Sequence, residues 1–159
     1  MTVSIRPLQK SDALTSFRWR NDSEVFKYTE NTYAQEITVE TEMKWIEKVI
    51  NNPNDYRCAI IANGEYVGNV YLTDIDDKTA NYHIFIGEKA FWGKGIARIA
   101  SERIIEYAFN ELKLDCIYLK VKTQNERAYR LYISLGFEDY SSDQEWKTMK
   151  LVRKCFSKK

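Results

Sequence analysis

A strand, a glycine-containing loop and a long helix follow one another near the middle of this 159-residue chain, and this unit limits the possible folds most strongly. Alternate residues from Tyr82 to Ile86 are apolar, which is the period of a β-strand, and Gly87 ends the run. Residues 91–97, with the sequence FWGKGIA, come next. Apolar residues then recur at helical spacing over residues 96–112. The pattern predicts a β–loop–α unit with the glycines at the start of the helix.

The loop itself has the composition of a phosphate-binding turn. Gly93 and Gly95 permit a conformation in which successive backbone N–H groups converge, and the small Ala97 lets a ligand approach the first turn of the helix. Such a loop binds phosphate oxygens without a basic side chain. Its spacing is neither Gly-x-Gly-x-x-Gly nor the Walker pattern, which disfavours nucleotide-triphosphate hydrolysis. The alternative is that the two glycines only make a tight connection into the helix.

The remaining periodicity predicts a mixed sheet with helices on both faces, an α/β (α+β) fold in a single domain over residues 1–159. Thr38 and Ser11-Asp12 are candidate N-caps, and Asn63-Gly64 is suited to a two-residue hairpin turn. Residues 22–37 have no clear period and are expected to form a loop or broken helix. The expected order is β-α-α-β-β-β-α-β-α-β-β. Its strands are expected over residues 2–8, 56–62, 65–73, 80–86, 116–122, 137–140 and 147–153, and its helices over residues 11–21, 38–51, 96–112 and 125–135.

Composition excludes several classes of function. The formal net charge is +1, from 24 basic and 23 acidic residues, so no global field recruits nucleic acid or an anionic membrane. Three widely spaced cysteines and one histidine indicate no metal site and no disulfide framework. No apolar run approaches the roughly 20 residues of a membrane span, and the start lacks a signal peptide, so we expect a cytoplasmic protein. An apolar stretch around Met149 and Leu151 is a candidate pairing edge for a second subunit, giving a monomer or a homodimer.

Two motifs resemble those of the GNAT superfamily of N-acetyltransferases. The first is Trp92-Gly93-Lys94-Gly95-Ile96-Ala97, which is similar to the family's Gln/Arg-x-x-Gly-x-Gly/Ala loop at Gly95 and Ala97 and departs from it at Trp92. That departure is similar to a variant in the branch of ribosomal-protein N-terminal and amino-sugar acetyltransferases. The second motif, residues 125–132 followed by Gly136-Phe137, is similar to the family's Asn-x-x-Ala-x-x-Leu-Tyr...Gly-Phe segment.

The resemblance covers residues 3–137, including Gly68, and implies acetyl-CoA as co-substrate and a mostly antiparallel sheet of about seven strands. By the same analogy, the thioester lies in a V-shaped opening between the fourth and fifth strands, where residues 84–86 face residues 118–121 and a backbone N–H polarises the acetyl carbonyl. Asn125 either binds the pantetheine amides, caps a helix, or does both. The implied cofactor-binding residues are Ile84, Phe85, Ile86, Trp92, Gly93, Lys94, Gly95, Ile96, Ala97, Arg98 and Asn125, although solvation alone also explains Lys94 and Arg98.

Acetyl transfer to an amine also needs an acid and a base. The resemblance implies Tyr132 as the general acid for the departing thiolate, and a tyrosine is suitable because its reference pKa of about 10 lies above the roughly 8.5 of a cysteine-like thiol. The alternative is a tyrosine packed on the sheet with its hydroxyl in a structural hydrogen bond. His83 is the candidate base, since neutral histidine can accept a proton directly or through water. Glu30 and Glu88 are rivals, and a water chain to solvent would need no single base.

The acceptor is expected to bind near the Trp19-Arg20-Asn21 run, which is similar to one in relatives that act on nucleotide-linked 4-amino sugars. Arg20 is suited to a phosphate or carboxylate and Trp19 to stacking on a sugar or base, with Tyr28 and Tyr33 as further contacts. A core Trp19 and a paired surface Arg20 are the alternative. We expect a small-molecule amine, foremost a nucleotide-linked amino sugar. Open alternatives are a protein N-terminal amine, a polyamine bound by the acidic residues Glu24, Glu30, Glu36, Glu40 and Glu42, and a non-enzymatic acyl-CoA-binding module.

Overall fold

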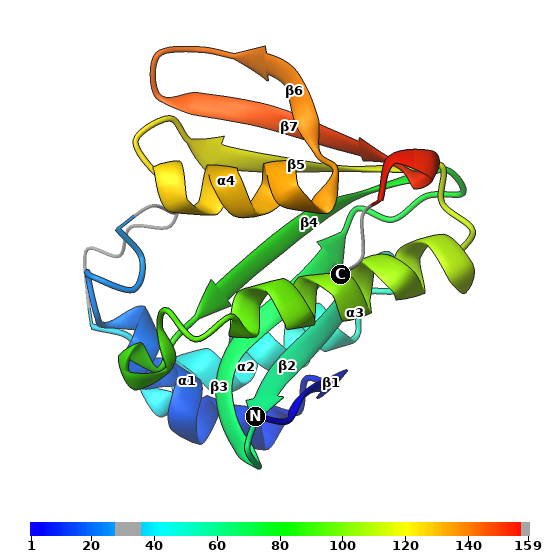
Figure 1. Ribbon diagram of the computed structural model, residues 1–159. Coiled ribbons are helices and arrows are strands. Elements are labelled where there is room, and N and C mark those ends of the chain that lie inside the picture. The colour runs from blue at the N-terminus through cyan, green and yellow to red at the C-terminus, as the bar shows by residue number, and fades with distance from the viewer. Residues whose placement is uncertain (28–35, 157–159) are drawn as a thin grey trace.

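The computed structural model describes residues 1–27 and 36–156, and in these residues the elements follow the predicted order (Figure 1). The strands are β1 (Val3–Pro7), β2 (Tyr56–Ala62), β3 (Glu65–Thr73), β4 (Thr79–Ile86), β5 (Cys116–Lys122), β6 (Glu138–Ser142) and β7 (Trp146–Val152). The α-helices are α1 (Ala13–Arg20), α2 (Val39–Ile50), α3 (Ile96–Asn110) and α4 (Glu126–Leu135), with short 3₁₀ turns at Lys10–Asp12, Lys89–Phe91 and Arg153–Cys155.

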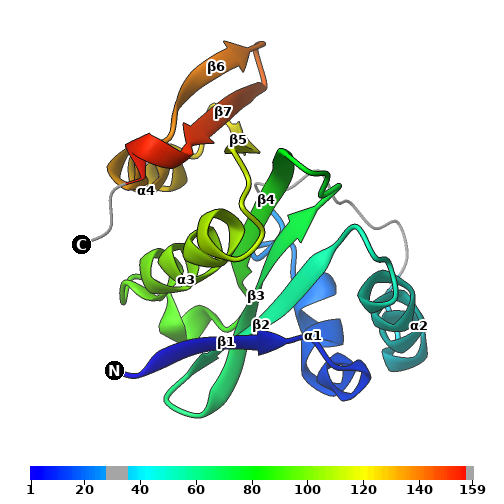
Figure 2. The same ribbon diagram turned by 90° about the vertical axis from the view of Figure 1, so that its right-hand side faces the viewer.

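The strands of the described residues form one seven-stranded sheet in the order β1-β2-β3-β4-β5-β7-β6. Among its strand pairs, β4 with β5 is parallel and the others are antiparallel. In Figure 2, α1 and α2 lie on one face of the sheet and α3 lies on the other, together with α4. The predicted mixed, mostly antiparallel sheet with helices on both faces is confirmed.

The core has two parts because the sheet is covered on both faces. The larger cluster fills the space between the sheet and α3 and α4, and contains Ile104, Ile117 and Leu135 with no exposed surface. The smaller cluster lies beneath α1 and α2 and includes Ile46 and Tyr71. Strand alternation explains the division, since successive side chains of one strand enter opposite clusters.

The structure confirms the predicted cap at Thr38 and the predicted turn at Asn63-Gly64, but not a cap of α1 by Asp12. Thr38 caps α2 as predicted, because its hydroxyl accepts a hydrogen bond from the Thr41 N–H at 3.1 Å. Asn63 and Gly64 both have positive φ, as the hairpin turn requires. Asp12 precedes α1 but makes no side-chain cap there. Its carboxylate instead pairs with Arg6 at 2.8 Å, which holds the first strand against the turn before α1.

Strand β7 is an internal strand, so the expected pairing of this segment with a second subunit is wrong. It lies between β5 and β6, and its Met149 and Leu151 side chains are fully buried in the larger core cluster. Both of its backbone edges are therefore already paired within the chain. The short strand β6, all of whose residues are exposed, forms that edge of the sheet instead.

Among the helices in the described part of the chain, none combines the length and the apolar character that crossing a membrane requires.

Candidate active site

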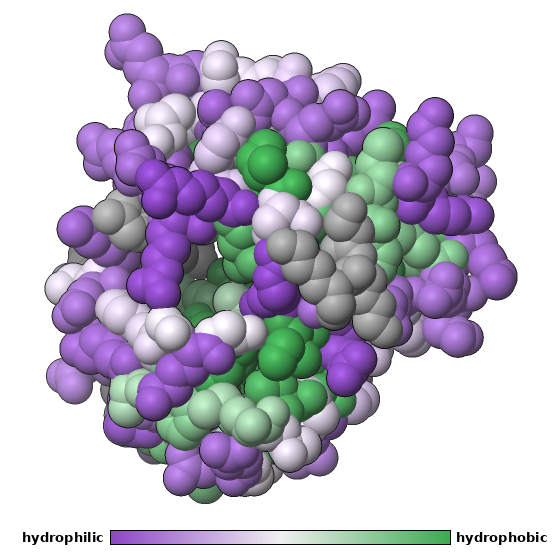
Figure 3. All heavy atoms as spheres, in the orientation of Figure 1, coloured by the Kyte–Doolittle hydropathy of each residue, from purple (hydrophilic) through white to green (hydrophobic). Residues whose placement is uncertain are grey.

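Strands β4 and β5 separate partway along their length and open a groove through the sheet. They pair only where Thr79–Asn81 lies beside Cys116–Tyr118, and residues 82–86 have no partner in β5. A groove of about 1680 Å³ follows this gap and is lined by residues 82–86 of β4 and 118–121 of β5, which include the residues 84–86 and 118–121 expected beside the thioester. Figure 3 shows this face hollowed, with hydrophilic side chains across the mouth. The volume exceeds the roughly 300–1,000 Å³ of a pocket for one small ligand, so two ligands can meet inside it.

One end of the groove is the glycine loop. Gly93 and Gly95 have φ of +76° and +78°, and helix α3 begins directly after Gly95. Alternating left-handed residues aim successive backbone N–H groups at one point, which suits an anion. A Cβ on Gly95 would have no protein atom within 4 Å, so the space beside it is open to a ligand. Arg98, in the first turn of α3, bonds Ser134 of α4 and keeps a buried Nη1 with no hydrogen-bond partner. These features fit a pyrophosphate.

Trp92, the residue that departs from the family motif, has a defined local contact. Its indole N–H donates a hydrogen bond to the Ile86 carbonyl at 2.8 Å, while the residue as a whole is 37% exposed and lines the groove. This bond ties the loop to the last residue of β4. Trp92 therefore fixes the distance between the glycine loop and the strand that would hold the thioester.

The backbone of β4 presents polar groups to the gap. The Phe85 carbonyl faces β3, since a Cβ on Gly68 would lie 2.4 Å from it. Backbone groups of neighbouring residues point to opposite edges, so those of Ile84 and Ile86 face the gap. On the β5 side, Asn125 caps α4 through its Oδ1, which accepts from the Ala128 N–H at 3.3 Å, and the residue also lines the groove. Its cap leaves the amide Nδ2 for a ligand.

Tyr132 of α4 lines the groove with its ring buried. The ring packs against Tyr82 at 5.9 Å, yet no hydrogen bond joins the Tyr132 hydroxyl to any residue that the structure describes. The alternative was that the Tyr132 hydroxyl makes a structural hydrogen bond. In the structure its neighbour Tyr82 makes such a bond instead, with its hydroxyl 2.5 Å from the Ser101 hydroxyl of α3. Burial raises the pKa of Tyr132 well above its ordinary value, so the phenol is protonated at neutral pH.

His83 lies on the opposite face of β4, toward α1 and α2, and lines the same groove. Its Nε2 is 3.0 Å from the Thr73 hydroxyl. The rival base Glu88 is engaged in other contacts, because its Oε1 accepts from Arg18 at 2.8 Å and from the Trp19 indole at 3.1 Å. His83 and Tyr132 thus approach the gap from its two faces.

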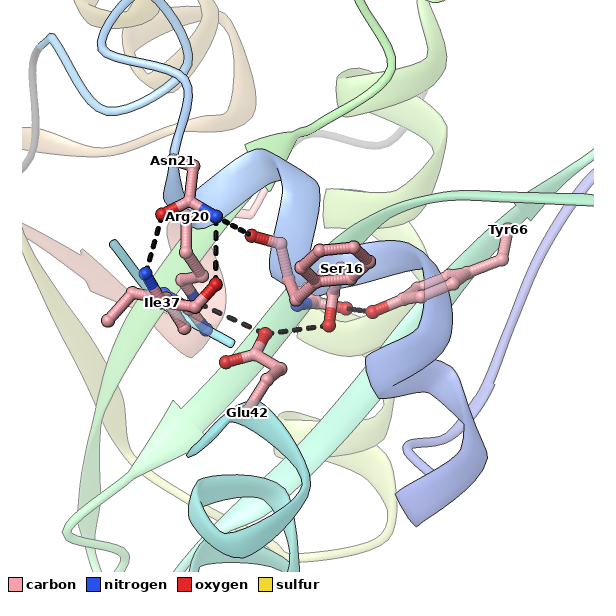
Figure 4. A network of polar contacts seen from close by, with 8 residues as sticks. Ser16, Arg20, Asn21, Ile37, Glu42 and Tyr66 are labelled. Atoms are coloured by element: carbon pink, nitrogen blue, oxygen red, sulfur yellow. Dashed lines mark hydrogen bonds and ion pairs between the residues drawn. The ribbon is translucent and has the colours of Figure 1, made fainter. Parts of the chain in front are cut away.

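The Trp-Arg-Asn run at the end of α1 contacts three separate elements. Trp19 is 3% exposed and packs so closely on Gly87 that an added Cβ would lie 2.0 Å from the ring. Arg20 donates to Glu42 of α2 at 3.2 Å, and Asn21 bonds both the N–H and the carbonyl of Ile37 (Figure 4). The structure therefore places Trp19 in the packing between α1 and the loop after β4, away from the groove wall where stacking was expected, whereas Arg20 lines the groove.

The wall beside Arg20 includes residues that the sequence did not single out. The Arg20 guanidinium lies 4.3 Å from the centre of the Trp45 ring, and Arg57 lies 4.4 Å from that of Tyr71. Arg57 is also paired with Asp55 at 2.9 Å. Strand alternation puts Arg57 and Tyr71 on the face of His83, but only the packing of α2 brings Trp45 to them. Tyr28, Tyr33 and Glu30, the other candidates on this side, lie outside the described residues.

Comparison with known proteins agrees with this geometry. A profile of the acetyltransferase (GNAT) domain matches residues 2–138. The chain is 32% identical over 139 residues to spermidine N(1)-acetyltransferase of Escherichia coli. The aligned region covers 86% of this chain and 73% of that protein. It is 22% identical over 130 residues to acetyltransferase PseH of Campylobacter jejuni, covering 82% and 79%.

Solved structures share the fold. The crystal structure of spermidine N-acetyltransferase from Vibrio cholerae in complex with CoA and spermine has a TM-score of 0.86 at 23% identity and covers 96% of both chains. That of C. jejuni N-acetyltransferase PseH in complex with acetyl coenzyme A has a TM-score of 0.75 at 19% identity, covering 96% of this chain and 99% of the other. Because the domain profile spans most of the sequence and the split sheet has the same architecture, the chain belongs to the GNAT acetyltransferase family.

Proposed function

We propose that the protein transfers the acetyl group of acetyl-CoA to a primary amine of a nucleotide-linked amino sugar. The observation that carries this proposal is the continuous groove between the glycine loop and the Arg20 side of the molecule, which passes through the gap between β4 and β5. Such a passage lets a thioester reach an amine that enters from the opposite face. The two substrates then meet at the unpaired part of β4.

The cofactor half of the proposal rests on open space and on unpaired donors beside the glycine loop. The open space at Gly95 and the buried Arg98 Nη1 suit the pyrophosphate, and Lys94 adds a charge beside them. The pantetheine arm would lie along residues 84–86, with Asn125 bonding its amides. A backbone N–H of Ile84 or Ile86 would polarise the acetyl carbonyl, which strengthens the electrophile without a charged side chain.

The arrangement of side chains suggests how the protons move. His83 would accept a proton from the acceptor ammonium, directly or through water, and free the amine lone pair. The amine nitrogen then forms a bond to the carbonyl carbon while the bond from that carbon to sulfur breaks. Tyr132, on the other face of β4, would donate its phenolic proton to the departing thiolate sulfur. The products are the acetamide and the free thiol.

The acceptor half favours an oxygen-bearing amine. Its two arginines are already balanced by carboxylates, Arg20 by Glu42 and Arg57 by Asp55, and both guanidinium groups lie over aromatic rings. The Arg57 Nη1 makes no hydrogen bond within the described residues and can donate to a sugar hydroxyl or a phosphate oxygen, and the neighbouring aromatic rings suit contact with a sugar ring or a base. A guanidinium group has no hydrogen-bond acceptor to offer the ammonium groups of a polyamine.

A polyamine acceptor is the second candidate, because the relative at 32% identity is named a spermidine N(1)-acetyltransferase. Glu24 and Asp74 also line the groove and could bind ammonium groups. Acetylation assays with spermidine and with a nucleotide-linked 4-amino sugar, read out as thiol release, separate the two. Preference for spermidine would overturn the sugar assignment. Acetyl-CoA binding without release on any amine would favour the binding module.

The first experiment is calorimetric titration of acetyl-CoA into the wild type and into Gly95→Glu. We expect measurable binding by the wild type and none by the variant, because the new side chain fills the space left for phosphate. Gly64→Glu is the matched control, since Gly64 has a similar φ of +82°, equally open surroundings and a position in a distant hairpin. Equal binding by the Gly95 and Gly64 variants would place the phosphate elsewhere. A folded wild type that binds no acetyl-CoA would overturn the proposed function.

A further inference from the structure

Arg127 projects from α4 toward the glycine loop across the mouth of the groove. It is the second residue of α4, and it lines the groove. A Cβ built on Gly93 would lie 3.1 Å from the Arg127 Nη2, so the guanidinium rests directly beside the loop. The hydrophilic side chains that bridge the hollow in Figure 3 lie over this mouth. The Arg127 guanidinium of α4 therefore faces the backbone N–H groups of the glycine loop.

The Arg127 guanidinium has no partner in the part of the chain that the structure describes. Neither a hydrogen bond nor an ion pair involves it there, and the residue is exposed. Arg130, one turn later, is by contrast paired with Glu126 at 3.6 Å. An unpaired guanidinium keeps all five of its donors for a ligand, whereas a paired one must first exchange a partner.

The glycine loop and Arg127 of α4, which face each other across the groove, both suit a phosphate group. The loop at Gly93 and Gly95 supplies converging N–H groups, and an arginine supplies a planar fork that matches two phosphate oxygens. Loop amides alone would leave the outer oxygens of a diphosphate in water. We propose that Arg127 closes the phosphate site from the α4 side by binding the pyrophosphate of acetyl-CoA opposite the glycine loop.

This inference rests on acetyl-CoA being the co-substrate, and it adds a consequence for the rest of the site. Helix α4 also carries Tyr132, little more than one turn after Arg127. Binding of the pyrophosphate by Arg127 would hold α4 against α3 across the groove. Occupancy of the phosphate site would thereby set the position of the proposed acid.

The test is calorimetric titration of acetyl-CoA into the wild type, Arg127→Gln and the matched variant Arg130→Gln. We expect Arg127→Gln to raise the Kd at least about tenfold, since charge-assisted bonds to phosphate are lost, and Arg130→Gln to change it by less than about twofold. The loss in Arg127→Gln should shrink as salt concentration rises. Unchanged binding by Arg127→Gln would overturn the inference while leaving the proposed function intact.

Acetyl-3′-dephospho-CoA distinguishes the pyrophosphate from the other phosphate of the molecule. If Arg127 binds the pyrophosphate, Arg127→Gln raises the Kd for this analogue by the same factor as the Kd for acetyl-CoA. A variant that binds the analogue as tightly as the wild type does would assign Arg127 to the 3′-phosphate and overturn the proposal. Absence of wild-type binding to both compounds would remove this inference together with the proposed function.

Discussion

Two tyrosines that touch each other illustrate how environment decides the use of a side chain. Tyr82 and Tyr132 pack edge to face and are both buried. The Tyr82 hydroxyl is bonded to Ser101, which in turn donates to the Ala97 carbonyl in the first turn of α3. The Tyr132 hydroxyl has no such bond within the described residues. Tyr82 therefore stabilises the start of α3, whereas the free Tyr132 hydroxyl fits the role of acid proposed for it.

The Tyr132→Phe variant tests this distinction. We expect kcat to fall by roughly 10²-fold or more, which is the usual contribution of a general acid, while the Kd for acetyl-CoA stays the same. The free energy of unfolding should hardly change, because no hydrogen bond in the described structure is lost. Steady-state kinetics, calorimetric binding and urea denaturation measure the three quantities.

Tyr129→Phe is the matched control, because it removes a hydroxyl from the same helix that bonds the exposed Asp139 at 3.0 Å. It should leave kcat unchanged. An unaltered kcat in Tyr132→Phe would exclude Tyr132 as the acid and favour proton delivery by water.

At the scale of elements, a buried polar network joins α1 to α2. Glu42 of α2 accepts hydrogen bonds from Ser16 at 2.6 Å and from Arg20 at 3.2 Å, and both charged side chains are almost completely buried (Figure 4). Asn21 joins the start and the end of the segment between the two helices through its bonds to Ile37. The position of Arg20, which lines the groove, thus depends on its ion pair with Glu42.

Replacing one member of this network should destabilise the whole protein. We expect Glu42→Gln to lower the free energy of unfolding by about 3–5 kcal/mol, because it removes the charge of a carboxylate that is paired with the buried Arg20 guanidinium. Glu47→Gln on the same helix breaks the exposed pair with Lys10 and should leave the free energy of unfolding nearly unchanged, because a pair in water contributes little. Urea denaturation compares the two. Equal effects would show that the Arg20–Glu42 pair contributes no more than a surface pair.

At the scale of the whole molecule, the buried tyrosines limit stability at high pH. Burial raises the pKa of Tyr66, Tyr82 and Tyr132 well above the ordinary value of about 10. The unfolded chain releases these protons near pH 10 while the folded chain keeps them, so the folded state binds more protons there. Stability should be flat up to about pH 9 and then fall by about 1.4 kcal/mol per pH unit for each such tyrosine.

Urea denaturation between about pH 8 and pH 11 measures this dependence. Tyr82→Phe should make the decline shallower by about 1.4 kcal/mol per pH unit, whereas Tyr140→Phe, which alters a 61% exposed side chain, should leave it unchanged. A free energy of unfolding that stays constant to pH 11 would mean that these hydroxyls ionise normally in the folded protein.

Sequence periodicity was sufficient for the element order and for most element ends. The alternation along β4 placed Tyr82 and His83 on opposite faces, and Thr38 and Asn63-Gly64 set a helix start and a turn through bonds to their immediate neighbours. Residues 84–86, the glycine loop and Asn125 were likewise predicted to share one site, and the structure brings them to one groove. These features are local, so a short stretch of sequence contains all the interactions that produce them.

Only the tertiary structure decided which of these residues meet partners from elsewhere. Trp19 became a packing residue because Gly87 and Glu88, far away in sequence, form its pocket, and β7 became internal because β6 pairs with its outer edge. Arg57, Trp45 and Arg127 gained places in the groove through the packing of α2 and α4, and no local pattern marks them. The sequence by itself determined the elements and the glycine loop, since backbone conformation depends on near neighbours. The proposed acceptor wall and the proposed second side of the phosphate site depend on contacts between distant segments, and folding alone creates those.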